Sequence, residues 1–371
     1  MKKVLITVCS VVIVALLAIV LVNFNKNNTP KDIVDGEFGF LRNSFDLKNE
    51  KIEDTGATWY RPNFGSFTWG AMQKDEYSAI DFLKTDEIIN DAQKRGLNLD
   101  ITLFPYADWD QQANGEKCKV SASDEMLPRS KGDFETPGLP YYRCNPVNWI
   151  AYQKWLRAVV ERYDGDGIDD MEGLIAPVSH YEIVNEPDLM KDPKNDAGMQ
   201  FYIGTPETYV ELLKKSYTAI KSADDKTSVL VAGAAGVQPE FVKFWESVFS
   251  NTDIASYFDI ANVHCLSAPN QDKNDPTSDS ASDLNVKFYK NILSTYNISK
   301  PIWVTEAENI QGDNVSENAK RLEESVKNAL ANGAEKIFFT GSSLANDPMR
   351  YTSEILISEK NYYKNIISTV K

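Results

Sequence analysis

The chain has 371 residues, of which 42% are hydrophobic and 11% aromatic, and it carries a formal net charge of −15. This charge argues against a nucleic-acid partner, because phosphate binding needs clustered Lys and Arg side chains, but it is compatible with a neutral polymer such as a polysaccharide, or with solubility alone. Only two histidines occur, His180 and His264. They leave little scope for a histidine-rich zinc centre, and we expect neither a metal nor a cofactor.

Residues 1–22 form a separate N-terminal segment. Lys2 and Lys3 precede an apolar run over residues 4–22, which as a helix with a rise of ~1.5 Å per residue would cross a bilayer. The run is longer than the apolar core of a cleavable signal, and no small-residue cleavage site follows it. We therefore predict a signal anchor, a transmembrane helix that leaves the body outside the cytoplasm. A cleaved signal, which would release a secreted protein, is the alternative.

The remainder of the chain has the pattern of an α/β protein. Residues 23–35 are polar, as expected of a linker, and from residue 36 to 371 short apolar runs alternate with amphipathic segments. The predicted strands are 38–41, 57–63, 99–104, 181–186, 228–232, 259–264, 302–305 and 336–340. The predicted helices are a poorly formed segment before Gly56 and then 76–95, 146–163, 206–222, 239–250, 282–296, 317–331 and 359–370. This alternation predicts a single (β/α)8 TIM barrel over residues 36–371.

Two of these helices carry sequence signals for their first turn. Asn145 can cap the helix that begins at Pro146, and Thr205 can cap the helix that begins at Pro206. Proline suits the first position because its missing N–H would have no partner there.

A loop of about 40 residues follows the third predicted strand, and loops of this length in compact domains are usually functional or cross-linked. It contains Trp109, Cys118 and Cys144, and in an oxidising compartment we predict a disulfide between the two cysteines. Two free thiols are the alternative. Cys9 lies within the apolar N-terminal run, and Cys265 is expected to be a small buried residue at a strand end.

Two predicted strands end in glutamate. The stretch from Tyr181 to Asp188 reads as a buried strand that stops at Pro187, because proline cannot donate to a sheet ladder. It places Asn185 and Glu186 at the carboxyl end of the strand, and the run 302–306 places Glu306 at the end of another. In a closed barrel the carboxyl ends of the strands form one face, where active sites lie.

The polar residues that this interpretation collects on one face are Arg61, Asn63, Asn185, Glu186, His264 and Glu306. Two carboxylates across a cleft suit hydrolysis of an acetal, because one protonates the leaving oxygen while the other attacks the anomeric carbon or activates water. Glu306 would remain ionised if Arg61 reached it, and Glu186 beside a neutral amide would be protonated more easily. The alternative is that both glutamates are structural.

The run Asn185-Glu186-Pro187, together with Trp303-Val304-Thr305-Glu306 on the seventh strand, resembles the clan A glycoside hydrolases. Within that clan the chain looks most like families 39 and 5, and the segment HYEIVNEPDL is closest to family 39. The resemblance covers residues 36–371. It implies that Glu186 is the general acid/base and Glu306 the nucleophile of a retaining double displacement on β-linked glycans. It also implies that Asn185 binds the 2-hydroxyl of the reacting sugar, that Arg61 orients Glu306, and that His264 occupies the polar position at the end of strand six.

Two departures from family 5-like sites concern substrate specificity. The segment His264-Cys265-Leu266 lacks the tyrosine often found two residues after the histidine, and residues 337–340 lack a terminal tryptophan. A non-catalytic glycan-binding barrel is therefore a second hypothesis. A barrel hydrolase of another chemistry is a third, for which no G-x-S-x-G motif is present.

Other residues allow two interpretations. Glu308 could compete with Glu306 as the nucleophile, whereas Glu182 is expected to be an interior charge with a partner. His180 is expected at the surface or at a strand start, and Trp59 could either pack in the core or line a subsite. Trp69 and Trp109 are candidates for stacking on sugar rings, because they lie in loops on the predicted catalytic face. The expected partner is a polysaccharide or oligosaccharide, the membrane is expected to be contacted through the N-terminal helix only, and the protein is expected to be a monomer.

Overall fold

The computed structural model describes residues 33–42, 51–62, 64–120, 139–189, 200–237, 239–264, 266, 283–307, 315–340 and 353–370. Within these ranges, no helix combines the length and the hydrophobicity that crossing a bilayer requires. The predicted N-terminal helix over 1–22 and most of the linker lie outside the described residues, so the anchor stays a prediction.

The strands are all parallel to their neighbours. In chain order they are β1 (Phe38–Arg42), β2 (Trp59–Pro62), β3 (Asn98–Leu99), β4 (Ile101–Leu103), β5 (His180–Ile183), β6 (Ser228–Leu230), β7 (Ala261–His264), β8 (Ile302–Ala307) and β9 (Ala334–Phe339). One six-stranded sheet has the order β3-β2-β1-β9-β8-β7, and a three-stranded sheet has the order β4-β5-β6.

The two sheets join at both edges into a ring. Only Asp100 separates β3 from β4, and its N–H donates to the carbonyl oxygen of Tyr60 on β2 at 3.1 Å, so β3 and β4 act as one strand. On the other side, single parallel bridges between Leu230 and Ile260 and between Ala234 and Val263 connect β6 to β7. The described strands therefore close in the order that a (β/α)8 barrel requires, and each of the eight predicted strands overlaps an observed one.

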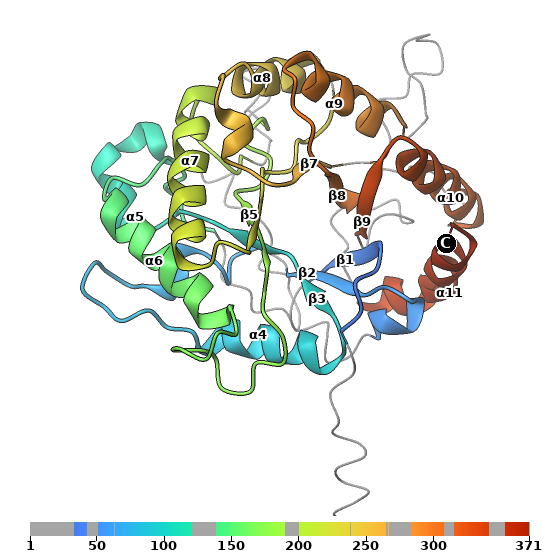
Figure 1. Cartoon of the computed structure of the whole chain (residues 1–371), viewed down its shortest axis with the longest axis horizontal. Helices are drawn as coiled ribbons and strands as arrows, with labels where there is room; N and C mark the ends of the chain where they lie inside the picture. Colours follow the sequence, from blue (N-terminus) through green and yellow to red (C-terminus); the bar gives the residue numbers. More distant parts are fainter. Residues whose placement is uncertain are drawn as a thin grey trace, which may run out of the picture.

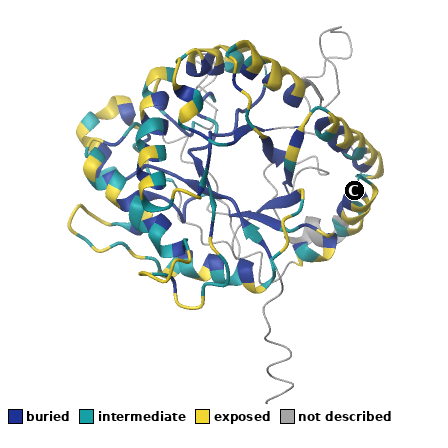
Figure 2. Cartoon of the chain, in the orientation of Figure 1, coloured by how far each residue is buried: buried dark blue, intermediate teal, exposed yellow. Residues whose placement is uncertain are grey.

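Helices surround the ring (Figure 1). They are α4 (Leu83–Lys94), α6 (Trp149–Tyr163), α7 (Pro206–Ala223), α8 (Pro239–Phe249), α9 (Asp283–Thr295), α10 (Val315–Ala331) and α11 (Ser353–Val370), with short α3 (Trp69–Met72) and α5 (Asp108–Gln111) in loops. Figure 2 shows the strands buried in the centre and the helices exposed on their outer sides. Between β1 and β2 the described residues hold only a 3-10 turn, η1 (Ile52–Thr55), where the sequence suggested a poor helix.

Local hydrogen bonds explain where two predicted helices differ from the observed ones. The helix predicted from residue 76 begins at Leu83, because the Asp75 carboxylate accepts from the N–H groups of Tyr77 and Ser78 and holds this segment in a turn. The helix predicted from Pro146 begins at Trp149, and its cap is Asn148, which accepts from the N–H of Ala151.

Asn145 is not a cap because its side chain is engaged elsewhere. Its Nδ2 donates to the carbonyl oxygen of Thr208 at 2.8 Å, and its Oδ1 accepts from the hydroxyl of Tyr202. By contrast, Thr205 caps α7 as predicted, with a reciprocal bond to Thr208 and Pro206 in the first turn.

Aromatic rings fill the barrel at the amino ends of the strands. Trp59, Trp303 and Phe338 are buried here, with the Trp59 and Trp303 rings 5.2 Å apart. His180, the first residue of β5, stacks on Trp303 at 4.9 Å, and burial lowers its pKa to about 4 with a contribution from Lys336. Trp59 is therefore core packing, and we call this group (Trp59, His180, Trp303, Lys336 and Phe338) the aromatic floor.

The predicted disulfide is present. Cys118 and Cys144 are bonded, with their Cα atoms 5.3 Å apart. The bond connects the two described parts of the long loop after β4, and the N–H of Arg143 donates to the carbonyl oxygen of Cys118 beside it. The loop is thereby fixed at one edge of the carboxyl face.

Candidate active site

The predicted catalytic side chains meet at the carboxyl ends of the strands. Arg61 comes from β2, His264 from the end of β7 and Glu306 from β8, while Asn185 and Glu186 directly follow β5. Arg61, Asn185 and His264 are completely buried, and the side chains of Glu306 and Glu186 retain 9% and 13% exposure. The two glutamates are thus the members of this group that reach solvent.

Arg61 organises the centre. Its Nη1 contacts Glu306 Oε1 at 2.6 Å, and its Nη2 donates to Asn185 Oδ1 at 2.9 Å. Nε and Nη2 contact Glu182 Oε2 at 3.0 and 2.9 Å. Burial opposes the charge of Arg61, but the carboxylates of Glu182 and Glu306 outweigh it and raise the Arg61 pKa, so the guanidinium stays charged.

Glu182 lies below the two candidate catalytic carboxylates, in the barrel interior. Besides Arg61, its Oε1 accepts from the N–H of Gly233 at 3.0 Å, and its Oε2 lies 3.4 Å from the hydroxyl of Thr305. It is fully buried. The prediction of an interior charge with a partner is therefore confirmed.

A second buried acid, Asp100, was not singled out from the sequence. Its Oδ2 lies 3.9 Å from Arg61 Nε, and neither carboxylate oxygen has a hydrogen-bond partner among the described residues. Burial raises the pKa of Asp100 well above its ordinary value, the negative charge of Glu182 adds to this rise, and the positive charge of Arg61 opposes it. Its only sequence signal is a charge within an apolar strand.

The backbone around Glu186 is strained. The sequence predicted a strand up to Pro187, but β5 ends at Ile183, and Val184 and Glu186 take positive φ angles of 68° and 36°. A β-branched residue rarely adopts such a conformation, which costs ~1–3 kcal/mol per residue and persists only where the surroundings impose it. The turn places the Glu186 carboxyl group beside His264, with Oε1 2.9 Å from Nδ1.

Asp188 holds this turn in place. Its carboxylate accepts from the N–H of Ala235 at 3.0 Å and from the indole Nε1 of Trp245 at 2.9 Å, and it is buried. These bonds connect the segment after β5 to the loop after β6 and to α8. This role of Asp188 was not predicted, because its only sequence signal is an acid directly after the Asn-Glu-Pro run.

His264 connects the two candidate catalytic carboxylates. Its Nδ1 lies 2.9 Å from Glu186 Oε1 and 3.7 Å from Glu306 Oε1, and its Nε2 lies 3.0 Å from Thr305 Oγ1. Burial lowers the His264 pKa, so the ring is neutral. A Cβ on Gly233 would come within 1.8 Å of Nε2, so only glycine leaves room for the imidazole.

The Glu186 carboxyl group holds its proton more tightly than an ordinary glutamate does. Burial raises the Glu186 pKa to about 7; the charge of Arg61 opposes this rise, and that of Glu182 adds to it. Glu306 instead makes a direct 2.6 Å contact with the Arg61 guanidinium. The site therefore holds one carboxyl group that is readily protonated near neutrality beside one that is paired with a cation.

The separation of the two glutamates is short. An oxygen of Glu186, an oxygen of Glu306 and a ring nitrogen of His264 all lie within 4.8 Å of one another. Asn185 Nδ2 is buried beside them and has no hydrogen-bond partner among the described residues. A buried donor without a partner is costly, so it is available to a hydroxyl of a bound ligand.

Two of the remaining predicted site residues can be placed. Trp69 has no exposed surface, and its ring lies 4.7 Å from Trp109, which is partly exposed. Both indoles donate to Gln73: Trp69 Nε1 to the side-chain Oε1 at 2.8 Å, and Trp109 Nε1 to the backbone carbonyl oxygen at 2.9 Å. Trp109 is therefore the indole that can stack on a sugar ring, and buried Trp69 packs against it. Asn63 and Glu308 lie outside the described residues.

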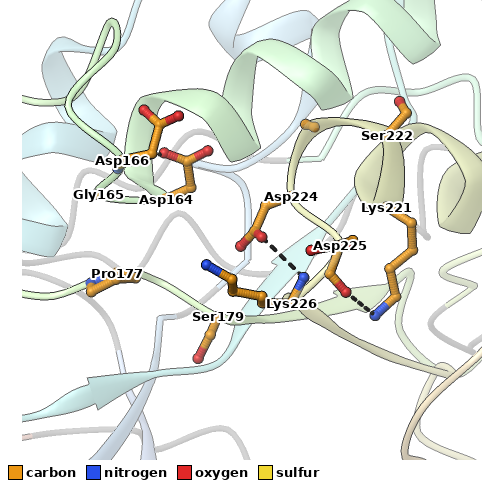
Figure 3. A pocket seen from close by; sticks show the side chains of 11 residues that line it. Asp164, Gly165, Asp166, Pro177, Ser179, Lys221, Ser222, Asp224, Asp225 and Lys226 are labelled. Atoms are coloured by element: carbon orange, nitrogen blue, oxygen red, sulfur yellow. Dashed lines mark hydrogen bonds between the residues drawn. The ribbon is translucent and has the colours of Figure 1, made fainter.

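A hollow of about 760 Å³ opens at the opposite, amino end of the barrel (Figure 3). It is lined by acidic and basic side chains, among them Asp164, Asp166, Lys221, Asp224 and Lys226. None of the residues assembled around Arg61 lines it. The chemistry assembled above therefore lies at the other end of the molecule.

Solved structures provide the comparison, since no protein-family model and no curated protein matches the chain. A glucosidase from Croceicoccus marinus is similar with a TM-score of 0.61 and 14% identity over 93% of this chain and 69% of its own. An endo-1,4-beta-mannanase from Rhizomucor miehei has a TM-score of 0.54 and 12% identity over 92% and 98%. The chain has the fold of glycoside hydrolases.

That similarity includes the family that the sequence suggested. A family 39 glycoside hydrolase from Bacteroides cellulosilyticus WH2 has a TM-score of 0.50 and 15% identity over 82% of this chain, which spans 56% of that enzyme. The predicted resemblance to clan A glycoside hydrolases is thus confirmed for the fold. On a shared fold, the residues of the site decide the chemistry.

Proposed function

We propose that this protein is a retaining glycoside hydrolase that cleaves β-linked glycans by double displacement. The observation that carries the proposal is the pair of carboxylates, with oxygens within 4.8 Å of each other and opposite electrostatic surroundings. Retaining enzymes hold their two carboxyl groups about 5–5.5 Å apart, whereas inverting enzymes need room for a water molecule between them.

In the first step, Glu306 attacks the anomeric carbon while Glu186 gives its proton to the glycosidic oxygen. The bond between the anomeric carbon and that oxygen breaks, the leaving sugar departs with the proton, and a glycosyl ester forms on Glu306. Arg61, 2.6 Å from Glu306, orients the attacking oxygen and favours its ionised form. The raised pKa of Glu186 keeps a proton available near neutrality.

In the second step, Glu186 accepts a proton from water, whose oxygen attacks the anomeric carbon and releases Glu306. Two inversions leave the configuration retained. The free Asn185 Nδ2 can donate to the 2-hydroxyl of the reacting sugar, and the exposed part of Trp109 can stack on a neighbouring ring.

Mutation of the two glutamates tests the proposal. Glu306→Ala should lower kcat by at least about 10⁴-fold, and Glu186→Ala by about 10²–10⁴-fold. An activated aryl glycoside, whose leaving group needs no proton, should lose much less in Glu186→Ala. NMR of the first product should show the β-anomer.

Three results would contradict the proposal. Full activity in Glu306→Ala would exclude it as nucleophile, and an α-anomeric first product would exclude retention. Binding of glycans without turnover across a broad panel would instead favour a non-catalytic glycan-binding barrel. Circular dichroism of each variant provides the folding control.

We also propose that the protein is anchored in a membrane by residues 1–22, with the catalytic face directed away from it. The described chain enters the barrel at its amino end, where Asp35 accepts from the indole of Trp59 at 3.1 Å and the carbonyl oxygen of Val34 accepts from Asn98. A linker that joins the barrel at its amino end leaves the carboxyl face, which holds the proposed catalytic residues, open to a polymer. Membrane fractions that lack the full-length protein would contradict the anchor.

A further inference from the structure

The three side chains of the proposed catalytic centre also form a set of metal-ligand atoms. One oxygen each from Glu186 and Glu306 and a ring nitrogen of His264 lie within 4.8 Å of one another. The separations from Nδ1 are 2.9 Å to Glu186 and 3.7 Å to Glu306. Ligands about 2.1 Å from a tetrahedral zinc ion lie roughly 3.4 Å apart, between these two distances.

The imidazole is oriented as a metal ligand requires. On the far side of the ring, Nε2 lies 3.0 Å from Thr305 Oγ1, which is 3.4 Å from Glu182 Oε2. Thr305 Oγ1 also lies 3.1 Å from Asn262 Oδ1. Since the carboxylate of Glu182 and the amide oxygen of Asn262 can only accept, the hydroxyl can donate to one of them and accept from Nε2–H. This arrangement leaves the lone pair of Nδ1 directed at the two glutamates, and such an outer hydrogen bond is what usually orients a ligating histidine.

The surrounding charge favours a cation in spite of Arg61. The carboxyl groups of Glu182, Glu186 and Glu306 each lie within 4.0 Å of Arg61 or His264, so three acidic side chains gather around one guanidinium. Glu186 and Glu306 retain exposed surface, which leaves an entry path and a fourth coordination position for water. Three protein ligands with one open position are typical of accessible zinc sites.

We propose that Glu186, His264 and Glu306 bind a zinc ion that occupies the catalytic centre in competition with the glycan. The ion would engage both carboxylates that hydrolysis needs, so its binding switches hydrolysis off reversibly. The inhibitory consequence rests on the proposed function, whereas the binding site does not. No metal was expected from the sequence, because two histidines are few for a zinc centre. The position of His264 between two acids becomes apparent only in the fold.

Calorimetric titration of the full-length protein with zinc chloride tests the site. We expect one tight zinc ion per chain, and at least about tenfold weaker binding in both His264→Gln and Glu186→Gln. Cobalt chloride offers a spectroscopic test, because d–d absorption bands of the bound ion should change in His264→Gln. Unchanged zinc affinity in the two folded variants would overturn the proposal, as would the absence of binding to the wild-type protein.

The chain supplies a matched control. Glu161, Asp164 and Asp166 form a second group of carboxylates within 4.8 Å of one another, near the amino-end hollow. Asp166→Asn should leave the tight zinc site and its spectrum unchanged. If instead it removes the tight binding, the ion is held at that acidic loop and the proposal is wrong.

The two proposals can fail separately. If the wild-type protein binds zinc, His264→Gln abolishes this binding and no glycan is hydrolysed, the proposed zinc site is supported and the proposed glycosidase activity is wrong. If the protein hydrolyses a glycan, zinc does not inhibit the reaction and calorimetry shows no zinc binding, only the proposed zinc site is wrong. In an active enzyme, we expect zinc to raise the apparent KM and a chelator to restore the original value.

Discussion

The two ends of the barrel interior bury side chains of opposite character. At the amino end, the aromatic floor packs indole and phenyl rings around His180, with Lys336 Nζ 4.6 Å from the centre of the Trp59 ring. At the carboxyl end, Arg61 is surrounded by Glu182, Glu306, Asn185 and Asp100. The first end stabilises the ring by packing, whereas the second holds charges that are useful for chemistry and costly to bury.

The largest expected effect is at the carboxyl end. Arg61→Met leaves Glu182 and Glu306 buried without their cation, so we expect a loss of about 3–5 kcal/mol in the free energy of unfolding. Catalytic efficiency should also fall at least about 100-fold, because Glu306 loses its orientation. Urea unfolding and initial rates measure the two effects, and a variant that keeps both values would contradict the role of this network.

At the amino end, Trp303→Ala should destabilise the protein by about 3–5 kcal/mol through loss of ring contacts, without the catalytic defect of Arg61→Met. Trp303 contacts Trp59, His180 and Phe338. If the variant does not fold, Trp303→Phe should lose less stability and retain kcat. A specific fall in kcat in stable Trp303→Phe would show that the two ends are not independent.

The pH dependence of stability sharpens the contrast. The Glu186 pKa rises from an ordinary 4.5 to about 7 on folding, so the folded protein binds this proton more tightly than the unfolded chain. Stability is therefore full below the ordinary value, is lost as pH rises toward about 7, and stays lost above it. At 1.36 kcal/mol per pKa unit, the loss is about 3 kcal/mol.

Glu186→Gln should abolish this loss. It should therefore be more stable than the wild-type protein at pH 8, and similar to it at pH 5, although it lacks the proposed catalytic acid. Thermal unfolding at the two pH values measures the difference. Equal stability of the two proteins at pH 8 would mean that ionised Glu186 costs nothing in the folded state. The activity of the wild-type enzyme should likewise fall as pH rises through about 7 and its acid loses the proton.

The smallest expected effect concerns the cation of the amino end. Lys336→Met removes the contacts of Nζ with the Trp59 and Trp303 rings and the ion pair with Asp35, and should cost only about 1 kcal/mol. Since Lys336 lowers the pKa of His180, that pKa should rise above about 4 in the variant. Histidine proton NMR measures it. A loss as large as that of Arg61→Met would contradict the contrast between the two ends.

The strands and most helices were predictable because their apolar spacing depends on local periodicity. The Asn-Glu-Pro and Trp-Val-Thr-Glu runs likewise located Glu186 and Glu306, because strand ends lie on one face of any barrel. Those signals are contained in short stretches of sequence. They required no knowledge of which distant residues meet.

The features that the sequence did not reveal depend on contacts between distant segments. The left-handed turn at Val184 is held by bonds from Asp188 to Ala235 and Trp245, about 50 residues away. Asn145 has the right type and place for a cap, but Thr208 and Tyr202 compete for its side chain. The preference of a residue type for a cap position predicts its hydrogen bonds only where no distant residue binds the same side chain with better geometry.

Gly233 shows how strongly the proposed chemistry depends on an empty space. Its N–H binds Glu182, and its missing side chain leaves the room that the His264 ring occupies. One added methyl group would displace the imidazole from between the two glutamates while every acid remained in the sequence. Such a chain would still contain both catalytic glutamates in its sequence. Its proton donor, Glu186, would nevertheless have lost its contact with the His264 ring.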